Sequence, residues 1–407
     1  YHAHHRGIGR IGRVAYHLME EEGYSENDDL IQELRDLRDT ISLGTVPNVF
    51  SNVYWVLDER LDDGEFVDEE GNVTTESMCL GMRTFNALGY AWQRRNSEDG
   101  AGDAEQDGLG EGMGGMGNVD HDVMTTHLGG YDEESLSETM ESVAENLETY
   151  WDDDAGAFDF GDGTSYHINE LGALLDGLKA IYEFLYIDNY DDRSGQLTNE
   201  YDDPVADFDG HPYPNKVVNE ELATDVLNYT GQMLEAIFDA DIDWQYGAPE
   251  EVTFTDGTLE PASDTVDVGA TWKFLNQLWG GWSVFRESES EDSPQLLQEN
   301  YEGVWNSQDD VRGPVLEGGV LDGNHLDGDY PVATVSYTDG AVENDTVYTT
   351  TVASMLMGIE NVYRGSEDPE FRDWDDADSA AITEELFDVF QANIDLLQDE
   401  LIHYEAP

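Results

Sequence analysis

The chain has 407 residues, and its 92 acidic residues against 17 Lys and Arg give a formal net charge of −75. This charge excludes nucleic acid as a partner, because phosphate binding needs many Lys and Arg, and it excludes an anionic membrane surface for the same reason. Intrinsic disorder is also excluded, because 39% of the residues are hydrophobic and 11% are aromatic. We therefore expect a folded chain. Since no run of about eighteen apolar residues occurs, we expect no transmembrane segment.

The acidic surplus also indicates where the protein works. A globule of this mass exposes roughly 16,000 Å², which places the surplus charges about 15 Å apart. The Debye length is about 3 Å at 1 M salt and about 30 Å at 0.01 M, so neighbouring charges are screened from one another only in concentrated salt. Lysine is scarce, with Lys179, Lys216 and Lys273 alone in the chain. We interpret the protein as halophilic and archaeal.

The first residue and the single cysteine bear on the compartment. Tyr1 in place of Met indicates a removed leader or an incomplete N-terminus, and we expect an extracellular or cell-surface protein. Cys79 lies in the apolar stretch MCLGM, and one cysteine excludes a disulfide scaffold or a thiolate metal cluster. We expect Cys79 to be a small buried hydrophobic residue.

Helical periodicity runs along most of the chain, with short turns of Gly and Asp between helices and no alternation of strand and helix. The pattern predicts helices at 8–22, 28–43, 47–60, 74–96, 132–151, 166–187, 217–239, 266–287, 346–364 and 378–404. Residues 97–118 are rich in Gly and lack periodicity, so they are predicted to form a loop. We therefore expect an all-α fold with short β-hairpins in the loops, in a single domain over residues 1–407.

Four short segments repeat a common pattern. Each alternates apolar and polar residues and ends in an acidic turn with a glycine, at Gly71, Gly163, Gly257 and Gly340. Their spacings of 92, 94 and 83 residues suit a hairpin followed by two helices. Each of these glycines is predicted to adopt a positive φ in a hairpin turn. The helix after each turn carries a small residue early, which permits close packing: Gly81, Gly172, Gly269 and Ala353.

The segment WDDDAGAFDF, residues 151–160, resembles the Asp-x-x-x-Gly-Gly-Phe turn between helical hairpins in the sugar epimerase and six-hairpin glycosidase group. Asp152, Gly156 and Phe158 match that motif, and Ala157 replaces its second Gly. The later segments SYHINELGALLDGLKAIYEFLYI and VYTTTVASMLMGIENVYRG are similar to inner-helix segments of the group. The resemblance implies an α/α toroid that binds or processes carbohydrate, and it names no substrate.

Candidate site residues gather in the loops before the expected inner helices, where a toroid has its funnel. They are Asp159, Asp162, His167, Glu170, His211, Tyr213, His325 and Asp327. Two carboxylates about 5 to 10 Å apart would hydrolyse a glycosidic bond, whereas a His or Tyr would exchange a proton in a lyase or an epimerase. His167 and Glu170, one helical turn apart, are expected to face one cavity beside Asp159 and Asp162. Four tryptophans offer stacking platforms, although the helical spacing of the last three is more typical of a core: Trp244, Trp272, Trp279 and Trp282.

Two further interpretations remain open. A transition-metal site would use imidazole, carboxylate and thioether groups of His2, His4, His5, His17, Glu20, Met113, Met116, His121, Asp122, Met124 and His127. Calcium would instead use the Asp-rich turns at Asp188, Asp191, Asp192, Asp207 and Asp209. Beside binding or processing carbohydrate, the chain could therefore be a self-assembling surface-layer or filament subunit, or a metal-binding extracytoplasmic protein.

The charge predicts a protein whose stability depends on salt. We expect the melting temperature to fall by tens of degrees, or the helical signal to be lost, when KCl is lowered from about 2 M to about 0.05 M. Circular dichroism at the two concentrations measures this. Reversing a few surface Asp residues to Lys is expected to restore part of the stability at low salt. An unchanged melting temperature would contradict the halophilic interpretation.

Overall fold

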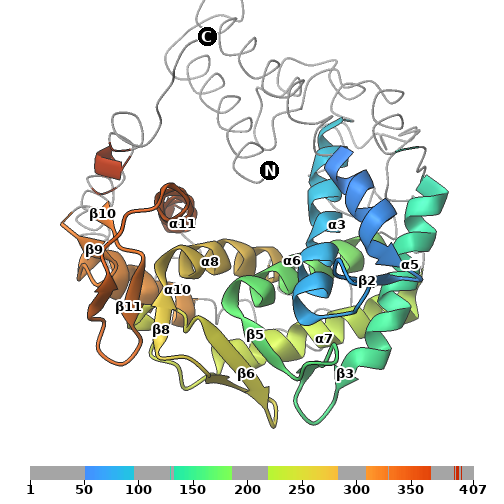
Figure 1. Ribbon diagram of the computed structural model, residues 1–407, viewed down its shortest axis with the longest axis horizontal. Coiled ribbons are helices and arrows are strands. Elements are labelled where there is room, and N and C mark those ends of the chain that lie inside the picture. The colour runs from blue at the N-terminus through green and yellow to red at the C-terminus, as the bar shows by residue number, and fades with distance from the viewer. Residues whose placement is uncertain are drawn as a thin grey trace, which may run out of the picture. The chain divides into compact units, whose positions relative to one another are not determined.

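The computed structural model describes residues 51–95, 129, 133–185, 219–282, 309–328, 330–367, 389, 391–393 and 396 (Figure 1). Its contacts divide the chain into two compact units, the first comprising residues 1–149 and 177–227 and the second residues 150–176 and 228–407. Compactness alone does not demonstrate independent folding, so the single domain over residues 1–407 stays a prediction.

The first unit contains a two-stranded hairpin between helices. Residues 51–60 are helical and lead into β1 Leu61–Asp62, β2 Glu65–Phe66, α3 Thr75–Arg95 and α5 Glu133–Tyr150. The turn Asp63-Gly64 has φ values of 51° and 82°, the type I′ geometry that joins two antiparallel strands. The Asn146 amide of α5 donates to the Asp63 carbonyl at 2.8 Å and so holds this turn.

Phe66, at the end of β2, is buried against α3. Its ring meets the Phe85 ring edge-on with centroids 5.7 Å apart, and a Cβ at Gly81 would lie 2.1 Å from it. Glycine at 81 therefore allows the helix to approach the ring, which is the physical reason for a small residue early in α3. Cys79 is fully buried, as predicted.

The second unit begins with the turn on which the family resemblance rests. β3 Trp151–Asp152 pairs with β4 Ala157–Phe158, and Asp152 Oδ1 accepts the backbone N–H groups of Asp154 and Ala155 within the turn. The turn ends at Gly156, whose φ is 69°. Trp151 and Phe158 then pack on Tyr229 of α7 Glu220–Phe238, with ring centroids 4.5 and 5.3 Å away.

Two three-stranded antiparallel sheets each contribute a strand that leads into a helix, and these helices are α6 Ile168–Leu185 and α8 Val268–Trp282. The first sheet, in the order β5-β6-β7, comprises β5 Ser165–His167, β6 Glu251–Thr255 and β7 Thr258–Pro261. The second, in the order β12-β11-β8, comprises β8 Thr265–Asp267, β11 Thr334–Ser336 and β12 Val342–Asn344. β5 runs directly into α6 and β8 into α8, so the sheets fix both helix starts; they lie below the two helices in Figure 1.

The rest of the second unit surrounds α8. It contains the 3-10 turn η3 Trp244–Tyr246, α10 Asp309–Leu316, the π-helical turn η6 Glu317–Leu321, β9 Leu326–Asp327, β10 Tyr330–Pro331 and α11 Thr349–Glu367. α11 packs on α8, where a Cβ at Gly358 would lie 2.3 Å from the Trp272 ring. Trp272 is fully buried and Trp244 nearly so, so neither is a stacking platform for a sugar. The side chains of Trp279 and Trp282 lie outside the described residues.

These sheets make the fold mixed α/β, and the prediction of an all-α toroid is wrong. Hairpins were expected only inside loops, but β5 pairs with β6 and β8 pairs with β11, which come from distant parts of the chain. Pairing of that kind leaves no local periodic signal. The strands are also only two to five residues long, which is too short for alternation to stand out from helical periodicity.

The helix predictions that fall on described residues are largely confirmed, at α3, α5, α6, α7, α8 and α11. α10 and η6 were not predicted, because Gly313, Pro314, Gly318 and Gly319 interrupt the periodic pattern there. The predicted helices at 8–22 and 28–43, most of that at 378–404, and the loop at 97–118 lie outside the described residues.

The predicted positive φ is confirmed at all four glycine turns, with 82° at Gly71, 93° at Gly163, 72° at Gly257 and 68° at Gly340. Gly257 closes the β6–β7 hairpin together with Asp256, and Gly340 lies between β11 and β12. The hairpin predicted at Gly163 is wrong, because the strand that follows it pairs with β6 instead of with β4.

A finer repeat lies in the loops that precede α3 and α6. Asp68 Oδ1 accepts the backbone N–H groups of Glu70 and Asn72, and Asp159 Oδ1 accepts those of Gly161 and Gly163. In both loops the Asp carboxylate therefore accepts hydrogen bonds from the backbone N–H groups two and four positions later. These bonds, that from Asn72 above all, lower the pKa of Asp68.

Substitutions at Gly257 and Gly340 distinguish two energetic costs of adding a side chain, which are the strain of a positive φ and a steric clash. A Cβ at Gly257 meets nothing within 4 Å, so Gly257→Ala is expected to cost about 1 kcal/mol from its positive φ alone. A Cβ at Gly340 would lie 2.5 Å from the Tyr246 ring, and Gly340→Ala is expected to cost a further 1–2 kcal/mol, roughly. Chemical denaturation in concentrated KCl measures both. Equal losses would show that Tyr246 does not constrain the turn.

Candidate functional site

His167 and Glu170 together close the N-terminal end of α6. The backbone N–H of His167 donates to Glu170 Oε2 at 3.0 Å, and the backbone N–H of Asn169 donates to His167 Nδ1 at 3.2 Å. This reciprocal arrangement is a capping box in which His167 replaces the usual Ser or Thr. The three-residue spacing of His167 and Glu170 therefore has a structural role, which is to cap α6.

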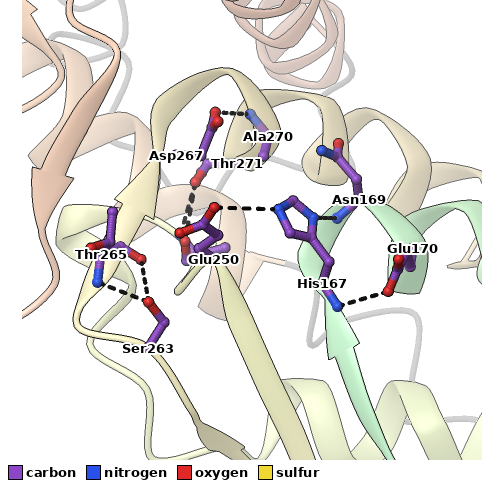
Figure 2. Close-up of polar contacts among 10 residues, drawn as sticks. His167, Asn169, Glu170, Glu250, Ser263, Thr265, Asp267, Ala270 and Thr271 are labelled. Carbon is purple, nitrogen blue, oxygen red and sulfur yellow. Dashed lines mark hydrogen bonds and ion pairs between the residues drawn. The ribbon is translucent and has the colours of Figure 1, made fainter. Parts of the chain in front are cut away.

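The other ring nitrogen of His167 lies beside a carboxylate. His167 Nε2 is 3.7 Å from Glu250 Oε1, and the two side chains are 32% and 40% exposed (Figure 2). Because Nδ1 accepts a hydrogen bond, the neutral imidazole carries its hydrogen on Nε2, which is directed at Glu250. A partly exposed carboxylate can exchange a proton with a ligand, and the neighbouring Nε2–H can donate a hydrogen bond to that ligand.

Glu250 is held by its backbone between the starts of α6 and α8. Its carbonyl accepts the N–H of Ile168 at 2.9 Å, and its own N–H donates to the Thr265 carbonyl at 2.8 Å. Sequence reasoning missed Glu250, because its partners come from β5 and β8. Its only local signal was its place directly before the apolar alternation of β6.

The start of α8 adds a third carboxylate at this end of the helices. Asp267 Oδ1 accepts the N–H of Ala270 at 2.7 Å and caps α8, while the Thr271 hydroxyl accepts the N–H of Ala248 at 3.1 Å (Figure 2). We name the group formed at the two helix starts the α6/α8 site. It consists of His167, Asn169, Glu170, Glu250 and Asp267.

Asp159 and Asp162 lie in the loop before β5. The Asp159 carboxylate shapes that loop through its two backbone hydrogen bonds, and Asp162 is exposed. A shared cavity for these two residues with His167 and Glu170 stays a prediction.

His325 lies in the core of the second unit. It is fully buried, its Nε2 is 2.8 Å from the Tyr246 carbonyl, and its ring meets the Trp272 ring edge-on with centroids 6.0 Å apart. Burial lowers the pKa of His325 from 6.5 to about 4, and the hydrogen bond to Tyr246 opposes part of that shift. Its neighbour in sequence Asp327 is exposed on β9. Sequence context alone did not reveal this burial, which the close approach of Gly319 to the ring permits.

The remaining candidate residues His211 and Tyr213 lie outside the described residues. So do the residues of the transition-metal hypothesis and the Asp-rich turns of the calcium hypothesis. Within the ranges that the structure describes, no three His, Cys, Asp or Glu side chains are grouped so that they could hold a metal ion. Among those same residues, none of the helices is both long and apolar enough to span a membrane.

No protein-family model matches this sequence, and no curated protein matches it. The proposed function therefore rests on the side chains of the α6/α8 site.

The buried His325 predicts a pH dependence of stability. The unfolded chain binds a proton at this residue below pH 6.5, whereas the folded chain binds it only below a pH of about 4, so the free energy of unfolding falls as the pH is lowered between those values. The contribution is about 3 kcal/mol over the window.

Chemical denaturation of the wild type and of His325→Gln from pH 7 to pH 4, in concentrated KCl, measures this contribution. Gln can still donate to the Tyr246 carbonyl, and the carboxylates contribute equally to both proteins. We expect the wild type to lose stability more steeply than the variant. Parallel curves would mean that His325 takes up its proton without leaving the core.

Proposed function

We propose that the α6/α8 site binds a neutral carbohydrate, and that Glu250 exchanges a proton with the bound sugar while His167 donates a hydrogen bond to it from Nε2. The observation that carries the proposal is the half-exposed pair, in which the His167 ring is held in one tautomer with Nε2 at 3.7 Å from Glu250. A positioned carboxylate can exchange a proton with a bound ligand, and a neighbouring imidazole N–H can hold that ligand by a hydrogen bond.

The cap of α6 decides which nitrogen faces the ligand. Nδ1 accepts the N–H of Asn169, so uptake of a proton at Nδ1 would break the cap, and while the cap is kept His167 acts as a hydrogen-bond donor through Nε2–H. The Glu250 carboxylate, 3.7 Å from Nε2, is then the group that takes a proton from the sugar and returns it, while His167 Nε2–H donates a hydrogen bond to the sugar.

The three carboxylates of the site favour proton exchange over hydrolysis by a carboxylate pair. Glu170 binds the backbone of His167 and Asp267 binds the backbone of Ala270, so each has a capping role. Glu250 makes no such contact with a helix start through its side chain. A site with one imidazole and one such carboxylate supports lyase-type or epimerase-type chemistry better than the two-carboxylate mechanism of a glycosidase.

The charge of the chain supports a neutral ligand. In a chain with a net charge of −75, the carboxylates of the site repel phosphates, sulfates and uronates at short range even in concentrated salt, while hydroxyl groups are unaffected. Carboxylates and the Asn169 amide are acceptors that bind sugar hydroxyls, and they require no cationic partner. We place this activity in a halophile, outside the cell or at its surface, on the strength of the acidic composition.

Self-assembly is the second candidate, and one observation favours it. Tyr330, Val342 and Tyr348, on or next to β10 and β12, are between 40% and 49% exposed, and large exposed hydrophobic side chains that recur in one region mark interaction surfaces. The mass in concentrated KCl distinguishes the two candidates. A discrete monomer or dimer favours the enzyme, and an open-ended polymer favours the assembly subunit.

The test of the proposed function separates capping from chemistry. His167→Ala would remove the cap and cost about 1 kcal/mol, so it confuses stability with activity. His167→Asn keeps an acceptor for the Asn169 N–H, since Asn is a preferred capping residue, but it lacks the imidazole Nε2–H. We expect His167→Asn and Glu250→Gln to lower turnover of a neutral oligosaccharide at least about 100-fold with little change in melting temperature.

The measurement is product analysis by NMR with a panel of neutral gluco-, manno- and xylo-oligosaccharides in about 2 M KCl. Glu251→Gln is the matched control, because Glu251 is the next residue along the chain and is exposed. It is expected to leave turnover unchanged. Full activity in His167→Asn, or a wild type that neither binds nor converts any member of the panel, would contradict the proposal.

A further inference from the structure

Gln277 is a buried amide with unsatisfied hydrogen-bonding groups. It lies on α8 with 2% of its surface exposed, and neither its Oε1 nor its Nε2 has a hydrogen-bond partner in the part of the chain that the structure describes. A buried polar atom without a partner costs about 1–3 kcal/mol, so such groups are rare in folded proteins and their presence needs a cause.

Gly172 of α6 makes room for this amide. A Cβ at Gly172 would lie 2.3 Å from Gln277 Oε1 and 3.0 Å from its Cδ, so any larger residue would displace the side chain. The glycine that the repeat pattern pointed to in α6 therefore brings the backbone of this helix directly against the Gln277 amide. The contact places Gln277 in the seam between α6 and α8.

Asn169 lies on the same face of α6, one turn before Gly172. Its Oδ1 is also buried and unpaired among the described residues, although the residue as a whole is only half-buried. Its backbone N–H holds the His167 ring, and its side chain extends toward the start of α8 (Figure 2). We name Asn169, Gly172 and Gln277 the amide seam.

The Gln277 amide and the Asn169 Oδ1, which have no partners among the described residues, offer one kind of chemistry. Each carboxamide presents an acceptor oxygen next to an NH₂ donor, and each sugar hydroxyl both donates and accepts, so one amide can bind two adjacent hydroxyls. The groups are uncharged, which suits a neutral ligand. A leucine or methionine at position 277 would fill the same volume without the cost of the unpaired amide.

We propose that the amide seam is the hydroxyl-binding subsite of the α6/α8 site. Asn169 and Gln277 bind adjacent hydroxyl groups of a neutral sugar and thereby set its orientation toward His167 Nε2. Asn169 is half-buried and Gln277 is 2% exposed, so Asn169 is the more accessible of the two amides. The inference rests on the proposed function and names the residues that select its ligand.

The test is Gln277→Met, which keeps the length of the side chain and removes both polar atoms. In the unliganded protein we expect the variant to melt a few degrees higher than the wild type, because an unpaired amide has been removed. For the neutral oligosaccharide that the wild type binds most tightly in the panel, calorimetry is expected to show at least a tenfold weaker affinity.

Asn169→Ala is the second variant, since a partly exposed position in the first turn of α6 tolerates Ala without endangering the fold. It is also expected to weaken binding at least tenfold. Glu251→Gln serves as the matched control, because its side chain is exposed and outside the amide seam, and it should keep the affinity of the wild type for the sugar.

Each outcome decides between the two proposals. A wild type that binds no neutral oligosaccharide overturns the proposed function and the subsite with it. A wild type that binds, together with variants that bind equally well, overturns the subsite alone. A lower melting temperature of Gln277→Met also overturns it, because the amide would then have a structural partner such as a trapped water. Higher stability with weaker binding supports the amide seam.

Discussion

Two backbone hydrogen bonds at Glu250 determine the geometry of the candidate site. Ile168, the first residue of α6, donates to the Glu250 carbonyl, and Glu250 donates to Thr265, the first residue of β8, which runs into α8. The backbone of Glu250 therefore connects the starts of both helices. The pairing of His167 with Glu250, and the position of Asn169 beside it, depend on this connection.

Two side chains at the candidate site occupy positions that lower the stability of the fold. A histidine serves as a helix cap where Ser or Asp would be the ordinary choice, and a glutamine is buried without a partner where an apolar residue would be more stable. Proteins retain such departures from local optimality mainly at functional sites. Both departures occur at or beside the N-terminal half of α6, and the strong negative charge of the chain leaves neutral molecules as their natural ligands.

Local features of the fold could be predicted from the sequence, whereas long-range ones could not. Helical periodicity located the main described helices, and the acidic-glycine turns gave the backbone conformation of Gly257 and Gly340. The sheets were missed because β8 and β11 pair across distant parts of the chain. For the site, the spacing of His167 and Glu170 identified the right place but not the role, since a capping box and a ligand-binding face share the same three-residue spacing. Glu250 and Gln277 became visible only once strand pairing and helix packing were known.

The central claim is that His167 has a fixed tautomer and that its Nε2 meets the ligand. The most direct measurement is long-range ¹H–¹⁵N NMR of the imidazole nitrogens in ¹⁵N-histidine-labelled protein in concentrated KCl, with His167→Asn identifying the signal. The account predicts that neutral His167 carries its hydrogen on Nε2, and that adding the neutral oligosaccharide shifts the Nε2 signal while Nδ1 remains an acceptor. A hydrogen on Nδ1 in the neutral ring, or an Nε2 signal that does not respond to the bound sugar, would contradict it.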